Sequence, residues 1–231
     1  MSQAPTSPPV ITIDGPSASG KGTVSREVAS HLGWHMLDSG ALYRLTALAA
    51  LKRGVSWADE ETLQALARHL DIEFREHRGS TLVILDGEDV SREIRSEQCS
   101  LGASQVAVLG QVREALLARQ RAFLQTPGLV ADGRDMGSVV FPQARLKIFI
   151  TASAEERANR RYNQLKQGGN SVNLADLLTD IQARDRRDSE RSLAPLKAAA
   201  DAHVIDTTSM TVAQVVQKVL SLWKALPKEA S

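Results

Sequence analysis

Nine residues near the start of the chain, Gly-Pro-Ser-Ala-Ser-Gly-Lys-Gly-Thr at 15–23, constrain the fold more than any other feature. They follow an apolar run at 10–13 and precede a helix-compatible stretch, which is the context of a phosphate-binding loop. Glycine at positions 15, 20 and 22 lets the backbone N–H groups curl round an anion, because it has no Cβ and reaches positive φ cheaply. The sequence therefore predicts an α/β fold that binds a nucleoside triphosphate.

Lys21 supplies a mobile charge for the β- and γ-phosphates, and a helix beginning near it directs its positive dipole end at the same anion. The general loop pattern has a hydroxyl directly after the lysine, whereas here Gly22 takes that place and Thr23 follows. This ending is typical of nucleoside monophosphate kinases. The alternative is a structural strand–helix turn. The loop residues expected to bind the nucleotide are Gly15, Pro16, Ser17, Ala18, Ser19, Gly20, Lys21, Gly22 and Thr23.

Composition excludes several classes of protein. The chain has 231 residues, 42% hydrophobic and 24% charged, and its 28 basic against 27 acidic residues leave a net charge of +1, which gives no general attraction to nucleic acid or anionic membranes. Cys99 is the only cysteine, so an internal disulfide is excluded and a reducing compartment fits. No apolar stretch approaches the ~18 residues of a membrane span, and residues 1–9 lack the regions of a signal peptide. We expect a cytoplasmic protein.

Strand and helix signals alternate along most of the chain. Apolar runs at 10–14, 34–38, 129–132, 146–150 and 204–206 are separated by helical segments, which predicts a doubly wound, five-stranded parallel sheet. The segment 71–90 breaks the alternation, because runs at 72–74 and 82–85 have strand character and Asp86-Gly87 is a hairpin signal. We therefore expect a small antiparallel insert, with a flexible leader at 1–9 and a flexible tail at 225–231.

Five stretches of the chain resemble the bacterial-type cytidylate kinases, which transfer a phosphoryl group from ATP to CMP or dCMP. They are ITIDGPSASGKGT, LDSGALYR, the helix ASQVAVLGQVREALLARQRAF, ADGRDMGSVVFP, and RDRRDSER followed by APL. The resemblance covers residues 10–224 and implies an adenylate kinase-like arrangement. Its core would be 10–38, 115–154 and 192–224, its monophosphate-binding part with the insert 39–114, and its helical lid 155–191.

Arg44 is expected to bind the acceptor phosphate, and Ser39 is expected to bind the substrate with it. A helix beginning near Ser39 places Arg44 about one and a half turns along, where its planar guanidinium can donate two parallel hydrogen bonds. The alternative is a surface arginine after a serine N-cap.

The resemblance also assigns Ser104 and Arg113 to the cytosine ring, yet nine residues on one long helix place them on different stripes of the helix surface. Either the helix begins after Ser104 or one side chain reaches across, and for Ser104 a helix cap is the competing interpretation.

The segment 131–137 ends a buried strand with three charged residues and two glycines, which suits a ligand-lined loop better than packing. The resemblance assigns Asp132 to Mg²⁺ through water, with Thr23 as the other metal-binding residue. It assigns Arg134 to phosphate and Asp135 to the cytosine amino group, which a carboxylate can accept from. Uracil, with a carbonyl in that place, would be repelled.

The stretch 174–191 has an apolar helical face that turns charged. Charges on such a face are costly unless they are paired or face a polar cavity, so we expect the helix to run into an anion-binding cleft. The alternative is an exposed i, i+4 ion pair. The resemblance assigns Arg184 and Asp188 to the ribose and Arg191 to phosphate, while Arg187 could clamp the transferred group. The face comprises Leu174, Leu177, Leu178, Ile181, Arg184, Asp188 and Arg191.

Arginines and Gly168-Gly169 between 150 and 174 predict a helix–loop–helix lid that closes over ATP. Arg160 and Arg161 are expected on the triphosphate, while a solvated charge cluster is the competing interpretation of Arg157.

Phosphoryl transfer needs alignment and cationic stabilisation more than covalent chemistry. The residues expected to provide these are Lys21, Arg134, Arg187 and Arg191, with ATP and Mg²⁺ in a lid-closed cleft. Alternatives are a kinase for UMP, AMP, dTMP or a non-nucleotide, or a noncatalytic nucleotide switch. A nucleic-acid-dependent ATPase is disfavoured because aromatic residues make up only 4% of the chain. We expect CMP and dCMP as the partners of a monomer.

Overall fold

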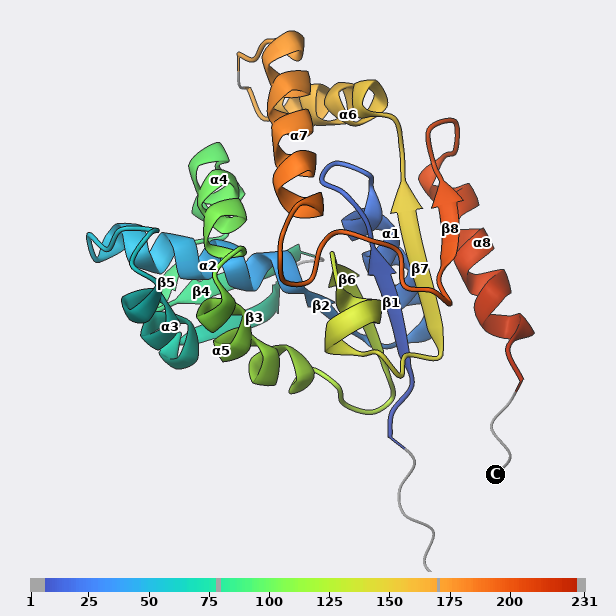
Figure 1. Ribbon diagram of the computed structural model, residues 1–231. Helices are drawn as coiled ribbons and strands as arrows, with labels where there is room; N and C mark the ends of the chain where they lie inside the picture. The colour runs from blue at the N-terminus through green and yellow to red at the C-terminus, as the bar shows by residue number, and fades with distance from the viewer. Residues whose placement is uncertain (1–6, 78–79, 170, 228–231) are drawn as a thin grey trace, which may run out of the picture. The chain divides into compact units, whose positions relative to one another are not determined.

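The central element of the computed structural model, which describes residues 7–77, 80–169 and 171–227, is a five-stranded sheet (Figure 1). Its order is β2-β6-β1-β7-β8, and β1 pairs in parallel with β6 and β7, as β7 does with β8. The predicted sheet is confirmed, whereas residues 1–6 and 228–231 of the expected leader and tail lie outside the described residues. The strands are β1 (Val10–Asp14), β2 (His35–Asp38), β6 (Leu129–Gly133), β7 (Leu146–Thr151) and β8 (His203–Asp206).

Alternation along β1 gives the sheet two different faces. Ile11 and Ile13 belong to an apolar core that also takes in Val28 of α1 (Lys21–Leu32) and Val219 of α8 (Val212–Ala225). Thr12 and Asp14 alternate with these residues, and their end of the strand contacts the single-turn π-helix η2 (Met136–Val140). The buried polar side chains of β1 thus lie on the face that η2 covers.

Residue contacts divide the chain into two compact units, 1–37 with 122–231, and 38–121. The first also holds α6 (Ala154–Gln167) and α7 (Leu174–Ser189), which pack against each other. The predicted division into core, monophosphate-binding part and lid stays a prediction. The second unit contains α2 (Ser39–Lys52), α3 (Glu60–His69), β3 (Ile72–His77), β4 (Ser80–Leu85), β5 (Glu88–Asp89), η1 (Glu93–Arg95), α4 (Glu97–Val106) and α5 (Gly110–Arg121).

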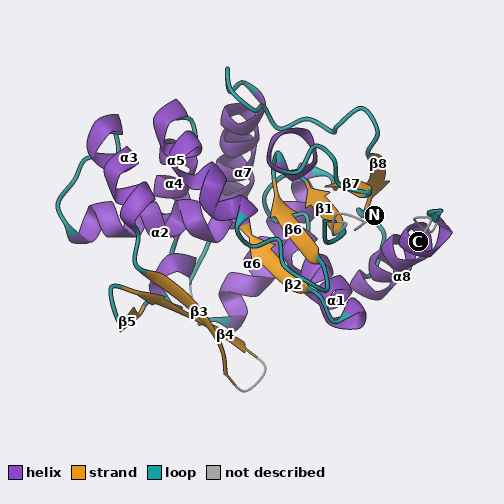
Figure 2. Ribbon diagram, turned by 90° about the horizontal axis from the view of Figure 1, so that it is seen from below, coloured by secondary structure: helices purple, strands orange, loops and turns teal. Residues whose placement is uncertain are grey.

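The predicted antiparallel insert is confirmed as a three-stranded sheet of order β3-β4-β5. Figure 2 shows these strands side by side. Asp86 and Gly87 have φ of 50° and 81° and form the two-residue turn between β4 and β5. Positive φ at both positions is what this tight hairpin turn requires, and Asp-Gly supplies it at low cost.

The expected single helix over 103–123 is wrong, because α4 ends at Val106 and α5 begins at Gly110. The burial pattern gives the reason. Ala103 and Val106 are buried in α4, and Val112 and Leu116 are buried in α5, a spacing that a straight helix cannot keep on one face. A break at 107–109 rotates the second helix so that both apolar faces pack inward. Within the described residues, no helix is long and apolar enough to cross a membrane.

Candidate active site

The phosphate loop after β1 has the backbone conformation that an anion cradle needs. Gly15 lies so close to β7 that a Cβ would come within 2.1 Å of the Ile150 carbonyl oxygen. Ala18 and Gly20 have φ of 56° and 89°, which turns the chain sharply before α1 begins at Lys21. Left-handed conformation in a non-glycine residue such as Ala18 is costly and is typical of functional loops. The predicted positive φ at Gly15 and Gly20 and the predicted helix start near Lys21 are confirmed.

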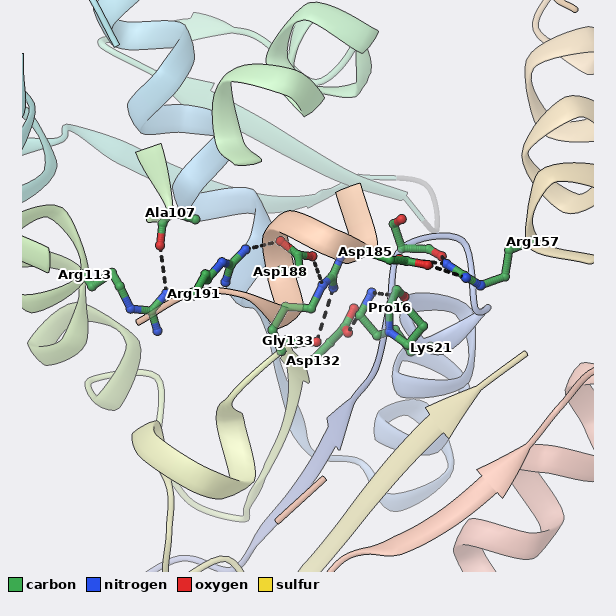
Figure 3. Close-up of polar contacts among 12 residues, drawn as sticks. Pro16, Lys21, Ala107, Arg113, Asp132, Gly133, Arg157, Asp185, Asp188 and Arg191 are labelled. Atoms are coloured by element: carbon green, nitrogen blue, oxygen red, sulfur yellow. Dashed lines mark hydrogen bonds and ion pairs between the residues drawn. The ribbon is translucent and has the colours of Figure 1, made fainter. Parts of the chain in front are cut away.

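Gly22 differs from the expectation, because it lies inside α1 and has no positive φ. Its missing side chain matters for another reason, since a Cβ there would come within 3.2 Å of Oδ2 of Asp132. The buried carboxylate thus lies against the first turn of α1, the turn that also carries Thr23, and its Oδ1 is 3.8 Å from Nζ of Lys21 (Figure 3). A carboxylate and a hydroxyl are the hard oxygen donors that Mg²⁺ prefers, so these residues fit the ion.

Two arginines of α6 hold the outer side of the phosphate loop. Arg157 donates to the Ser17 carbonyl oxygen at 3.3 Å, and Arg160 donates to that of Ser19 at 3.0 Å. Arg157 is buried and also pairs with Asp185 of α7 at 2.9 Å, so the interpretation of Arg157 as a solvated charge is wrong. The amides of such a loop face the anion, so these arginines stabilise the carbonyls that face away.

The same α6 arginines have further partners. Arg160 also donates to the Thr207 carbonyl oxygen at 2.6 Å and to Glu156 at 2.8 Å, and Arg161 donates to Gln164 at 2.9 Å. Roles for Arg160 and Arg161 on the triphosphate stay predictions. Sequence reasoning missed the bracing role of Arg157 and Asp185, because 28 residues separate them and no local pattern joins them.

A cluster of guanidinium groups surrounds Asp188 near the end of α7. The carboxylate is 1% exposed, accepts a hydrogen bond from Nε of Arg134 at 2.9 Å, and forms an ion pair with Arg191 (Figure 3). Burial works against ionisation, but the positive charges of Arg134, Arg191 and Arg184 outweigh it and hold the pKa of Asp188 below its usual range. The alternative of an exposed i, i+4 pair is wrong because Asp188 is buried. The structure therefore brings together three of the predicted arginines.

The remaining predicted residues of this unit flank the cluster. Arg134 and Asp135 follow β6, and Asp135 is buried while Arg134 also donates to the Gly133 carbonyl oxygen at 3.3 Å. Arg187 is exposed on α7, one residue before Asp188. On the apolar part of that helix Leu177 and Ile181 are buried, whereas Leu174 is 41% exposed. The helix thus passes from core contacts to the charged cluster as expected, while the individual ligand roles stay predictions.

In the second unit, Asp38 organises the start of α2. Its Oδ1 caps the helix by accepting from the Ala41 N–H at 3.0 Å, and its Oδ2 pairs with Arg44 at 2.8 Å. A Cβ on Gly40 would come within 3.2 Å of both Arg44 and Asp38, so glycine is what lets Arg44 fold back over the first turn. The N-cap is Asp38 and not Ser39, so the serine-cap alternative is wrong. Sequence reasoning missed this ion pair.

Ser39, Ser104 and Arg113 are placed by helix packing within the same unit. The buried Ser39 hydroxyl donates to Gln120 of α5 at 3.2 Å. Ser104 is buried inside α4, three residues before its C-cap Ala107, so it is not a helix cap. Arg113, in the first turn of α5, donates to the Ala107 carbonyl oxygen at 3.1 Å and lies 5.9 Å from the Tyr43 ring centre. The helix break thus lets the Arg113 side chain reach back to the C-cap of α4, the helix that carries Ser104.

Each unit therefore presents groups suited to anions. The first combines a phosphate loop with a second arginine cluster at the same strand ends, and the second holds Arg44 at a helix start. A single bound phosphate would not need both sets in the first unit. This arrangement suits a reaction with two phosphorylated reactants.

Comparison with known proteins gives a consistent family. A model described as cytidylate kinase matches residues 11–225. The chain is 60% identical over 216 residues to the cytidylate kinase of Azotobacter vinelandii, covering 93% of this chain and 94% of that one. It is 60% identical over 215 residues to the cytidylate kinase of Stutzerimonas stutzeri, covering 92% and 94%. Among solved structures, it is similar to a shikimate kinase from Acinetobacter baumannii, at 20% identity and a TM-score of 0.41 over 94% of each chain.

Proposed function

This chain belongs to the cytidylate kinase family, and on that premise we propose that it transfers the γ-phosphoryl group of ATP to CMP or dCMP. The observation that supports the reaction best is the pairing of two anion sites at one edge of one sheet. The phosphate loop follows β1, and the cluster of Arg134, Arg191 and Asp188 begins directly after the neighbouring β6. A phosphoryl donor and a phosphoryl acceptor each have a site of their own.

On the donor side, the loop amides and Lys21 bind the ATP phosphates. Thr23 and, through water, Asp132 would hold Mg²⁺, which when bound neutralises phosphate charge and orients the γ-phosphoryl group. Arg157 and Arg160 keep the loop in its curled form by binding its outward carbonyls. Arg160 and Arg161 contact the triphosphate when the segment 155–191 closes over it.

On the acceptor side, Arg44, Arg134 and Arg191 hold the monophosphate in line with ATP. Asp188 keeps Arg134 and Arg191 together against their mutual repulsion, so little reorganisation is needed when the acceptor binds. Arg184 and Asp188 bind the ribose, and Arg187 with Lys21 neutralises charge that develops on the transferred group. No general base is required, because the transition state is loose.

Selection of the base rests on a buried carboxylate. Asp135 accepts from the cytosine amino group, Ser104 and Arg113 bind the ring carbonyl and N3, and Ser39 of α2 also binds the substrate. A buried carboxylate rejects a ligand that offers an acceptor in place of a donor, because both groups would be left unpaired. This is the feature that favours CMP over UMP, and it separates this proposal from a kinase of another acceptor.

Two other properties complete the proposal. We place the protein in the cytoplasm as a monomer, with no nucleic-acid or membrane partner, in keeping with its net charge of +1. A noncatalytic nucleotide switch is the alternative, and the second arginine cluster argues against it because a switch has no second phosphate to bind.

The experiment that tests the function offers CMP, dCMP, UMP, AMP and dTMP separately with ATP and Mg²⁺, beside a blank without acceptor, and measures ADP. Rapid turnover with CMP and dCMP, and slow turnover with the other three, is the expected result. Equal hydrolysis in all six reactions, or none in any, would overturn the proposal in favour of a switch or a non-nucleotide kinase.

A further inference from the structure

The last residue of β1, Asp14, contacts a loop that lies more than one hundred residues away in the sequence. Its Oδ1 accepts a hydrogen bond from the Met136 N–H and its Oδ2 accepts one from the Gly137 N–H, both at 2.8 Å. Asp14 is buried, and its backbone stands opposite Gly133 in the β1–β6 ladder. One residue therefore fixes the chain at 133 and again at 136 and 137.

Only Arg134 and Asp135 lie between these two fixed points. Their backbone has little freedom, because the β1–β6 ladder holds Gly133 on one side and the Asp14 carboxylate holds the Met136 and Gly137 amides on the other. The far side of the loop is equally restricted, since a Cβ on Gly137 would come within 2.8 Å of the Thr12 hydroxyl oxygen and 3.2 Å of the Lys147 side chain. A small displacement at Asp14 is thus passed directly to Arg134 and Asp135.

A buried carboxylate is energetically unfavourable at this contact. Burial raises the pKa of Asp14 to about 7, although the two amide hydrogen bonds act to lower it. The negative charges of Asp135 and Asp132 also raise this pKa. A group that serves stability alone would not be a buried acid beside two others. The two acceptor oxygens, however, are what two parallel N–H donors need, and a neutral amide side chain offers one acceptor only.

We propose that Asp14 is a positioning residue for the acceptor, which sets the places of Arg134 and Asp135 and thereby the affinity and base selectivity for CMP. This inference rests on the proposed roles of those two residues. Asp14 also directly precedes Gly15, so the residue that holds the acceptor loop is continuous with the start of the ATP loop. Asp14 thus fixes the position of the 134–137 loop relative to the phosphate loop within this unit.

The test compares Asp14→Asn with Asp206→Asn, which makes the same change at the end of β8, where the exposed carboxylate accepts from Thr208 instead. The KM for CMP, the KM for ATP and the ratio of kcat/KM for CMP over UMP are measured for each, together with Tm. We expect Asp14→Asn to raise the KM for CMP about tenfold or more and to lower the CMP preference, since sub-ångström misplacement has costs of that order. The KM for ATP and all values of Asp206→Asn should stay within about twofold of wild type.

Equal rises in the KM values for CMP and ATP, or an unchanged CMP preference, would overturn the inference in favour of a structural role. If Asp14→Asn does not fold, Gly137→Ala perturbs the same contact from the loop side and must raise the KM for CMP selectively, failing which the inference is wrong. Wild-type turnover in the same series judges the proposed function separately. Its absence would refute that function, whereas an active wild type beside an unaltered Asp14→Asn refutes only the positioning role.

Discussion

Replacing Asp188 by Asn removes the charge around which the arginine cluster is built. The side chain keeps its size, so the change leaves no cavity, but Arg134 and Arg191 lose the carboxylate that pairs with both. Breaking a buried ion pair by removing one partner costs about 3 to 5 kcal/mol. The lower end applies here, because an amide oxygen can still accept one hydrogen bond. We therefore expect Asp188→Asn to lower the free energy of unfolding by about 3 kcal/mol.

In a chain of this size 1 kcal/mol corresponds to about 2 to 4 °C in Tm, so the fall should be about 6 to 12 °C. Differential scanning calorimetry of the protein without nucleotide measures it. Glu156→Gln is the matched control, since it also removes one charge of an arginine pair, but on a partly exposed helix surface. Its effect should be below about 0.5 kcal/mol.

The same variant tests why the destabilisation occurs. Unbalanced guanidinium groups form an anion site, so inorganic sulfate should raise the Tm of Asp188→Asn more than that of wild type, where the carboxylate competes for the arginines. A Tm within about 2 °C of wild type, or equal sulfate shifts in both proteins, would refute the claim that Asp188 holds mutually repelling arginines together.

Three further predictions concern substrate selection, catalysis and pH. Asp135→Ala should lower the CMP-over-UMP ratio of kcat/KM by at least about tenfold while the KM for ATP is kept, and an unchanged ratio would remove its role in reading the base. Arg191→Ala should lower kcat/KM for CMP by about a hundredfold without unfolding the protein, and an active variant that melts early would make its role structural. Because the folded pKa of Asp14 is raised from 3.8 to about 7, the native state binds more protons than the unfolded chain across this window, so stability should fall as pH rises through it. Urea unfolding with a metal chelator at several pH values should show wild type losing stability relative to Asp14→Asn by up to about 1.4 kcal/mol per pH unit, and parallel curves would contradict it.

The sheet could be predicted from local patterns because its strands are short, apolar and bounded by turns. Val10–Asp14 and the other four strands of its sheet follow directly from such runs, and Asp86-Gly87 marks the hairpin by its turn chemistry. The phosphate loop was equally accessible, since its residues are contiguous. What the pattern misjudged was Gly22, whose role depends on the distant Asp132 and not on its own φ.

Contacts between distant segments could not be predicted in the same way. The pairing of Arg157 with Asp185 and the clamp that Asp14 forms with the 136–137 amides join residues whose spacing carries no periodic signal. The helix break at 107–109 was also not predicted, because the residues there are helix-forming. The second helix is rotated by the burial of Val112 and Leu116, which is a tertiary effect. Such features depend on packing that a one-dimensional pattern does not contain.

The claim of two phosphate sites serving one transfer is tested most directly by product stoichiometry. ATP, Mg²⁺ and CMP are mixed with the enzyme, and ADP and CDP are separated by anion-exchange chromatography over the time course. We expect ADP and CDP to form in equal amounts from the first time point, and ADP formation to be close to zero when CMP is left out. ADP that accumulates without CDP, or at the same rate with and without CMP, would contradict it.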